Sequence, residues 1–278
     1  MNTSNGSTKE QTISGPTVSE EAPILLRSDQ AGVATLTLNR PKQFNALSEA
    51  MLTALQQELD NIAANEEIRV VVIAATGKAF CAGHDLKEMR AHSGYGEQKR
   101  LFEQCSRMML TIHHLPQPVI AQVHGLATAA GCQLVAACDL AVAAENATFA
   151  TSGIRVGLFC STPSVPVSRA LPQKKALELL LTGEFIDAAT AAQFGLVNQV
   201  APAEELESAV QRLVAAITNK SAYAIRSGKQ MFYRQLEMEL EEAYAYAAEV
   251  MACDMQADDA AEGIDAFLQK RQPVWQGR

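Results

Sequence analysis

The sequence predicts an α/β fold, in which strands and helices alternate along the chain and pack in layers. Three observations support this. An alternating run over 33–41 is followed by an amphipathic helical pattern over 48–64, and then by a continuous apolar run over 69–76. Alternation of strand and helix patterns is typical of layered α/β cores. The chain of 278 residues is long enough for one large domain with an appendage.

The first elements follow from side-chain periodicity. "VATLTLNRP" alternates with period two and stops at Pro41. In "SEAMLTALQQELDNIAA", Leu52, Leu55, Leu59 and Ile62 share one helical face. Ser48 precedes this helix and is suited to accept a hydrogen bond from its free N–H groups.

The next strands are expected to be buried on both faces. "RVVVIAAT", "QPVIAQVHG" and "DLAVAAEN" are runs of mostly apolar residues, as strands covered by helices on both sides should be. A short helix is expected between the last two, within "GLATAAGCQLVAACD".

The C-terminal third is predicted to be helical. Leu206, Val210, Leu213, Val214 and Ile217 form one stripe. A single long helical segment is expected over 227–254 and a short one over 262–273. We therefore divide the chain into a disordered tail (1–21), a core (22–202) and a helical C-terminal region (203–278). The last region either packs against another subunit or covers its own domain.

Composition narrows the classes of partner. The net charge of −8 argues against nucleic-acid binding and against a polybasic membrane contact. No apolar run reaches the roughly 18–20 residues of a membrane span. The six cysteines lack zinc-site spacing, so we expect no metal, and we expect buried, reduced thiols in a cytoplasmic protein. A catalytic role for Cys160 is the alternative for these thiols.

Two turns carry the strongest sign of chemistry. In "GKAFCAGHDLKEM" and in "HGLATAAGCQ" a strand ends in small residues and a helix begins. Glycine permits a tight turn and close approach of a ligand to the main chain. A helix start presents free N–H groups. Two such turns facing each other would form an oxyanion hole, a pair of N–H donors for a developing negative charge on oxygen.

Taken together and in order, several blocks resemble the enoyl-CoA hydratase/isomerase (crotonase) superfamily. They are "NRPKQFNALS", "AFCAGHDLKEM", "HGLATAAGCQLVAACDLAVAAENATF", "LTGEFIDAATAAQFGLVNQV" and "EGIDAFLQKRQP", and the resemblance runs from about Ala31 to Trp275. It implies a spiral of ββα turns with a helical trimerisation region. It also implies a homotrimer or a dimer of trimers, and a nominal lyase or isomerase of fatty acid metabolism. The expected ligand is an acyl-CoA thioester, with coenzyme A as part of the substrate and no permanently bound cofactor.

The resemblance also implies roles for individual residues. The thioester oxygen would be held by the backbone N–H groups of His84 and Ala130. The coenzyme A arm would lie along Lys42, Phe44 and Ala46, and along 82–87. Lys229 is a further candidate for a phosphate contact. The substrate-binding set is therefore Lys42, Phe44, Ala46, Ala82, Gly83, Asp85, Leu86, Lys87 and Lys229.

Both proton-transfer positions depart from the family pattern. One family glutamate falls at Gln133, three residues after Ala130, which returns its side chain to the same helical face. The other falls at Gly153, in "FATSGIRVG". Glutamine does not exchange a proton near neutral pH, and glycine has no side chain. The sequence therefore predicts very low hydratase turnover, and Gln133→Glu with Gly153→Glu is expected to restore some activity.

Alternatives stay open at this point. Cys160, Ser161, Glu184, Glu88 or the His84 side chain are candidates to move protons in place of the glutamates. The residues 158–171, "LFCSTPSVPVSRAL", are interpreted as a loop. A thioesterase or an isomerase would suit a site with fewer acids. An acyl-CoA-binding protein without turnover is an equal alternative to an enzyme. An unrelated α/β protein with coincidental motifs is a third and weaker alternative.

Overall fold

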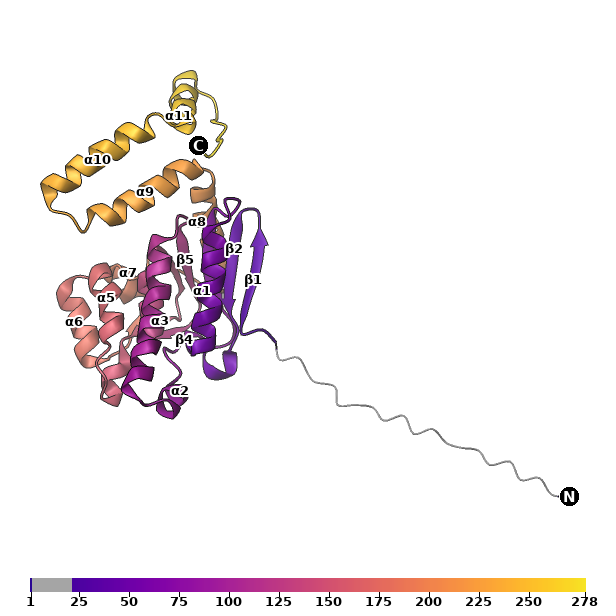
Figure 1. Cartoon of the computed structure of the whole chain (residues 1–278), viewed down its shortest axis with the longest axis vertical. Helices are drawn as coiled ribbons and strands as arrows, with labels where there is room; N and C mark the ends of the chain where they lie inside the picture. Colours follow the sequence, from indigo (N-terminus) through magenta and orange to yellow (C-terminus); the bar gives the residue numbers. More distant parts are fainter. Residues whose placement is uncertain (2–21) are drawn as a thin grey trace.

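A computed structural model describes Met1 and residues 22–278 of the chain (Figure 1). The tail expected over 1–21 falls, beyond Met1, outside the described residues. Among these residues, no helix is both long and apolar enough to cross a membrane.

The larger sheet has six strands in the order β1-β2-β3-β5-β7-β10. β1 and β2 are antiparallel, and every later neighbour is parallel. Its strands are β1 (Leu25–Gln30), β2 (Val33–Leu38), β3 (Val70–Ala75), β5 (Val119–Val123), β7 (Leu140–Ala144) and β10 (Gln199–Ala201). β3 is buried over its first five residues, as its continuous apolar run predicts.

The smaller sheet has four strands in the order β4-β6-β8-β9. They are β4 (Ala79–Cys81), β6 (Leu126–Thr128), β8 (Thr148–Ala150) and β9 (Ile186–Asp187). The chain places β3, β5 and β7 in the larger sheet and follows each with one strand of the smaller sheet and then a helix. This repeated ββα turn is the spiral expected of the fold class, which is confirmed.

Helices cover both faces of the larger sheet. On one side α1 (Glu49–Ala63), α3 (Tyr95–His114) and α4 (Ala130–Ala137) enclose the main core between the sheets. Ser48 accepts a hydrogen bond from Met51 N, so the predicted start of α1 is confirmed. On the other side α8 (Leu206–Thr218) packs on Val70, Val72 and Val142. α8 thus belongs to the core layers, although it lies after residue 203.

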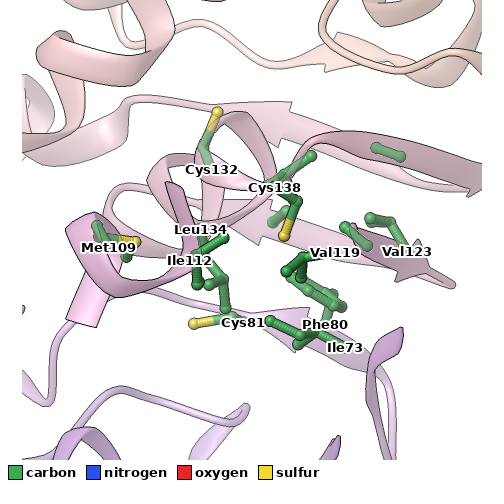
Figure 2. Close-up of a cluster of buried hydrophobic side chains, with 14 of the residues drawn as sticks. Ile73, Phe80, Cys81, Met109, Ile112, Val119, Val123, Cys132, Leu134 and Cys138 are labelled. Carbon is green, nitrogen blue, oxygen red and sulfur yellow. The ribbon is translucent and has the colours of Figure 1, made fainter. Parts of the chain in front are cut away.

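Part of the main core lies directly beneath α4 (Figure 2). Phe80, Ile73 and Val119 group together in this view, and Leu134 and Ile112 lie next to them. All five side chains are fully buried or nearly so. α4 is therefore held on a packed apolar base, which fixes the position of its first turn.

The segment 158–171 is not the loop that its sequence suggests. α5 (Ser161–Ala170) is helical despite Pro163 and Pro166. Pro163 lies in the first turn, where the missing N–H has no intrahelical acceptor in any case. Packing against α4, with Val167 fully buried, holds the rest of the helix.

Further helices complete the chain. α2 (Leu86–Ala91), α6 (Gln173–Thr182) and α7 (Ala188–Phe194) lie on the core, with short 3₁₀ turns at Pro41–Gln43, Ser152–Val156 and Ala203–Glu205. α9 (Ala222–Gln235), α10 (Leu240–Asp254) and α11 (Asp258–Gln269) lie beyond one end of the sheet (Figure 1).

The prediction of a single long helix over 227–254 is wrong. The chain breaks at 236–239 and α10 folds back along α9. This return places Arg234 over the Tyr246 ring, 4.5 Å from its centroid.

Candidate functional site

Three turns meet at one edge of the smaller sheet. β4, β6 and β8 are neighbouring parallel strands, and parallel strands end at the same edge. The segment after β4 contains Gly83 and His84, that after β6 contains Ala129 and Ala130, and that after β8 leads to Gly153. Ala129 N donates to Ala150 O at 3.0 Å, which ties the second turn to the third.

The turn before α1 supports the first of these segments. Ala82 N donates to Phe44 O at 3.0 Å, and Leu47 N donates to Gly83 O at 2.8 Å. Asn45 is fully buried with φ 54°, and its amide donates to Thr76 O and Ala79 O, each at 2.8 Å. The main chain around His84 is therefore fixed by short hydrogen bonds.

Gly83 permits the first two turns to touch. Its φ is +94°, and a Cβ atom there would lie 2.9 Å from Ala129 Cβ and 3.3 Å from Ala130 N. Both the backbone conformation and the space require glycine. The turns that the sequence singles out are thus brought into direct contact.

Two backbone donors are free at this junction. Within residues 22–278 neither His84 N nor Ala130 N donates a hydrogen bond. Ala130 is the first residue of α4, and Ala129 before it has φ 50° and ψ −119°, a conformation that alanine rarely adopts. The strained alanine turns the chain so that the start of α4 abuts Gly83.

The His84 side chain is held away from bulk water. Its Nδ1 lies 3.3 Å from Leu47 O, and its ring meets Phe102 edge to face at 5.5 Å between centroids. Nε2 is buried and has no hydrogen-bond partner in the described part of the chain. Burial lowers the pKa of the imidazole, opposed by the Leu47 contact, so the ring is neutral at neutral pH.

Gln133 lies in the first turn of α4 and is 3% exposed. Its N–H donates to Ala129 O at 3.0 Å, but its side-chain Oε1 is buried without a partner in the described residues. An unpartnered amide oxygen in the interior is unfavourable by about 1–3 kcal/mol. A ligand donor would satisfy it.

The surroundings of Gly153 exclude a side chain. A Cβ atom there would lie 2.6 Å from Leu158 O and 2.8 Å from Cys160 Sγ. The first contact is with backbone, which cannot rotate aside. The expectation that Gly153→Glu returns a carboxylate to this position is therefore wrong, because the Cys160 thiol and the Leu158 carbonyl fill its space.

Cys160 and Ser161 lie at the start of α5. Cys160 is buried, and burial raises the pKa of its thiol although the Gly153 backbone opposes the shift. Ser161 is exposed, and its N–H donates to Phe159 O at 2.8 Å. Neither residue has a base as a hydrogen-bond partner within 22–278, so neither is an activated nucleophile.

Two residues of the set expected to hold the coenzyme A arm, Lys42 and Asp85, line an open cleft of about 710 Å³. Lys42, Arg40, Asp85 and Glu88 are among its lining residues. Asp85 accepts from Arg40 Nη2 at 3.2 Å and from the N–H groups of Lys87 and Glu88. Burial alone would raise the pKa of this carboxyl, but these hydrogen bonds outweigh it and lower the pKa.

Other expected contact residues differ in exposure. The side chains of Lys42, Phe44, Leu86 and Lys87 are exposed, whereas Ala46 is buried and its carbonyl accepts from Arg40 Nη1 at 2.9 Å. Ala82 N is already bonded to Phe44 O. Only the exposed members of the set are free to meet a ligand through their side chains.

Lys229 does not offer a free ammonium group. Its Nζ donates to Ile112 O at 3.1 Å, to Gln117 O at 3.0 Å and to Asp139 Oδ2 at 2.6 Å. These acceptors use all three N–H bonds, and the side chain is 7% exposed. The expectation of a phosphate contact at Lys229 is therefore wrong, and the residue clamps α9 to the core.

The two other carboxylate candidates lie on or after helices, Glu88 in α2 and Glu184 after α6. Glu88 accepts from Glu49 N at 3.1 Å at the start of α1. Glu184 is exposed after α6, and its backbone N–H donates to Thr182 Oγ1. No group of three acidic, cysteine or histidine side chains suited to a metal occurs among the described residues.

Sequence reasoning missed Thr151. It follows β8 directly, is fully buried, and its Oγ1 has no partner in the described part of the chain. Three of the five buried unpartnered side-chain atoms there are His84 Nε2, Gln133 Oε1 and Thr151 Oγ1, one from each turn. A polar residue directly after a buried strand was the only signal available.

The buried thiols are inert. Burial raises the pKa of Cys81, Cys105 and Cys132 to about 12 each. In Figure 2 the sulfur of Cys132 points away from Cys81 and Phe80. These thiols stay protonated at neutral pH, which supports a packing role.

Comparison with known proteins gives consistent matches along the chain. Residues 28–278 match the family model described as enoyl-CoA hydratase/isomerase. The chain is 45% identical over 262 residues to mouse (Mus musculus) "Enoyl-CoA hydratase domain-containing protein 3, mitochondrial", covering 94% of this chain and 87% of that protein. It is 35% identical to the Escherichia coli 2,3-dehydroadipyl-CoA hydratase, covering 91% and 99%.

A solved structure is similar as well. The crystal structure of an enoyl-CoA hydratase from Mycobacterium smegmatis superposes with a TM-score of 0.90 at 55% identity. The match covers 91% of this chain and 99% of that one. The similarity therefore extends over both sheets and the C-terminal helices.

Proposed function

The chain belongs to the enoyl-CoA hydratase/isomerase family, and from this we propose that it binds acyl-CoA thioesters where the His84 and Ala130 turns meet. The observation that carries the proposal is the pair of free backbone donors at that contact. Both N–H groups would donate to the thioester oxygen. The cleft beside Lys42 and Asp85 would take the coenzyme A arm.

Efficient hydration of enoyl-CoA is not part of the proposal. Gln133 and Gly153 stand where the family resemblance implies two glutamates, so neither position supplies a proton. Hydration needs one group to activate water and one to protonate carbon, each worth roughly 10²–10⁴-fold. The two N–H donors still favour an enolate oxygen, at about 10²–10³-fold for a single donor.

The binding proposal is tested by comparing a thioester with its thioether. Butyryl-CoA carries the carbonyl oxygen, and S-butyl-CoA has a methylene group in its place. Two hydrogen bonds of about 0.5–1.5 kcal/mol each predict roughly tenfold tighter binding of butyryl-CoA by calorimetry. Failure to bind either ligand at millimolar concentration would refute the proposal.

A backbone variant isolates one donor. Ala130→Pro removes that N–H at the first position of α4, where the N–H has no acceptor within the helix. We expect the preference for butyryl-CoA to fall to about threefold or less, since one of the two hydrogen bonds is gone. Ala130→Gly keeps the N–H and should keep the preference. Equal preferences in both variants would place the thioester oxygen elsewhere.

We further propose that the protein assembles as a homotrimer or a dimer of trimers, as the family resemblance implies. Large apolar side chains are exposed on the C-terminal helices, among them Phe232, Leu240, Tyr244, Phe267 and Leu268. Such a surface on three successive helices is typical of an interface between subunits.

The cytoplasmic location expected from the cysteines stays a prediction. The mouse relative carries the word "mitochondrial" in its name, which supports a different compartment for that protein. Fractionation of the native host cells would decide the compartment for this chain.

A further inference from the structure

The His84 imidazole has one nitrogen without a partner. Nδ1 lies 3.3 Å from Leu47 O, and a carbonyl oxygen only accepts hydrogen bonds, so Nδ1 carries the proton. Nε2 of the neutral ring is therefore unprotonated and carries a lone pair. That lone pair is buried and has no donor among the described residues.

The ring is also fixed in place. The Leu47 contact holds one edge, and Phe102 of α3 meets the ring edge to face. The backbone of the same residue supplies one of the two free N–H groups of the proposed oxyanion hole. An acyl group bound through that N–H would lie beside the His84 side chain.

Other groups at the site are poorly suited to accept a proton. The Gln133 amide is not basic, and Gly153 has no side chain. The Cys160 thiol is buried and stays protonated. The neighbouring Asp85 is paired with Arg40 at 3.2 Å. Among the residues of the three turns, His84 Nε2 is the one neutral base with an unused lone pair.

We propose that His84 Nε2 is the proton-transfer group of this site and takes a proton from the α-carbon of a bound acyl-CoA. The inference rests on the proposed binding of the thioester. The Cα–H bond breaks, and its proton moves to Nε2. The electron pair forms the Cα–C double bond of an enolate, while the carbonyl π electrons move to the oxygen held by His84 N and Ala130 N.

The resulting imidazolium keeps its Nδ1–H on Leu47 O, a contact that favours the charged ring. Return of the proton to Cα restores the starting thioester, and no other reactant is required. In D₂O, water that reaches the site while the enolate is bound exchanges the Nε2 proton for deuterium, so the returned atom is deuterium. The predicted activity is therefore α-hydrogen exchange of a saturated acyl-CoA.

The experiment follows deuterium uptake into butyryl-CoA by mass spectrometry, with binding measured in parallel by calorimetry. His84→Ala removes the ring but keeps the backbone N–H, so butyryl-CoA should bind within about threefold of the native protein. Loss of a positioned base should slow exchange by roughly 10²–10⁴-fold. Added imidazole should occupy the vacated space and restore part of the exchange. His84→Gln serves as a second variant that fills most of the ring volume.

Each result supports or overturns the role of His84 Nε2 in proton transfer, or overturns the proposed binding. Exchange in the native protein, loss in both variants and rescue by imidazole in His84→Ala support the inference. Native exchange that persists in His84→Ala or in His84→Gln overturns it. Loss in His84→Ala without imidazole rescue overturns it as well, because the ring then acts through structure. Binding without native exchange overturns the inference alone, whereas absence of binding overturns the proposed function itself.

Discussion

At the residue scale, Gly153 lies where the folded chain leaves no room for a carboxylate side chain. Its absent Cβ would lie 2.6 Å from a backbone oxygen. We predict that Gly153→Ala destabilises the protein by about 1–3 kcal/mol, as overpacking does. Gly228 in α9 has open space around it, so Gly228→Ala should stabilise by about 0.5–1 kcal/mol. Urea unfolding of both variants compares them, and equal effects would show that Gly153 has room.

Ala129 stores strain at the start of α4. Its φ of 50° with ψ of −119° costs an alanine about 1–3 kcal/mol. Glycine adopts this conformation without strain. Replacing alanine by glycine also raises the conformational entropy of the unfolded chain, which lowers the free energy of unfolding by about 0.4–1 kcal/mol. We therefore predict that Ala129→Gly stabilises the protein by about 1 kcal/mol. Ala136→Gly, inside the same helix, should destabilise it by a similar amount. If urea unfolding shows that both changes destabilise the protein, the backbone of Ala129 is not strained.

At the element scale, α9 is tied to the core by one buried ion pair. Asp139 accepts from Lys229 and from Tyr233 Oη at 2.7 Å, and it lies two residues after the end of α4. We predict that Lys229→Met destabilises the protein by about 3–5 kcal/mol, because Asp139 is left buried without its cation. Hydrogen exchange of the α9 amides should rise in the same variant.

An exposed pair provides the control for this clamp. Lys99 and Glu103 lie 3.4 Å apart on the surface of α3. Lys99→Met should cost about 0.5 kcal/mol or less. If both methionine variants unfold at the same urea concentration, the Lys229 pair has no special role.

The helices and strands also show which parts of the fold can be predicted from sequence patterns. The start of α1 and the double burial of β3 follow from local patterns, and both are confirmed. α5 was missed because two prolines suggest a loop, while its packing against α4 comes from residues distant in sequence. The break between α9 and α10 was missed because no proline or glycine marks it.

In the candidate site, too, some features could be predicted from local sequence patterns and others depend on residues distant in sequence. The two glycine-containing turns are visible in the sequence, since each follows a strand and precedes a helix. The space around Gly153 and the partners of Lys229 are not visible, because the residues concerned meet only in the folded chain. Lys229 and Asp139, for example, are 90 positions apart. Local patterns therefore predict the main-chain framework of the site better than the surroundings of its side chains.

At the scale of the whole molecule, the proposed assembly depends on the C-terminal helices. Phe267 and Leu268 of α11 are 81% and 70% exposed. We predict a trimer or hexamer by light scattering at micromolar concentration. Changing both residues to aspartate should lower the mass, whereas Gln269→Asp should leave it unchanged. A monomer mass for the native protein would contradict the proposed assembly.

The central claim is a family scaffold that binds acyl-CoA thioesters but lacks the acids for efficient hydration. The most direct measurement is turnover of crotonyl-CoA by the native protein, followed by loss of the enoyl thioester absorbance, with crotonyl-CoA binding measured in the same sample. We predict binding together with turnover about 10⁴-fold or more below the ordinary enzymatic range of roughly 1–10³ per second. Turnover within that range would contradict the account, because hydration needs two proton-transfer groups, Gln133 and Gly153 supply neither, and His84 Nε2 is proposed as only one.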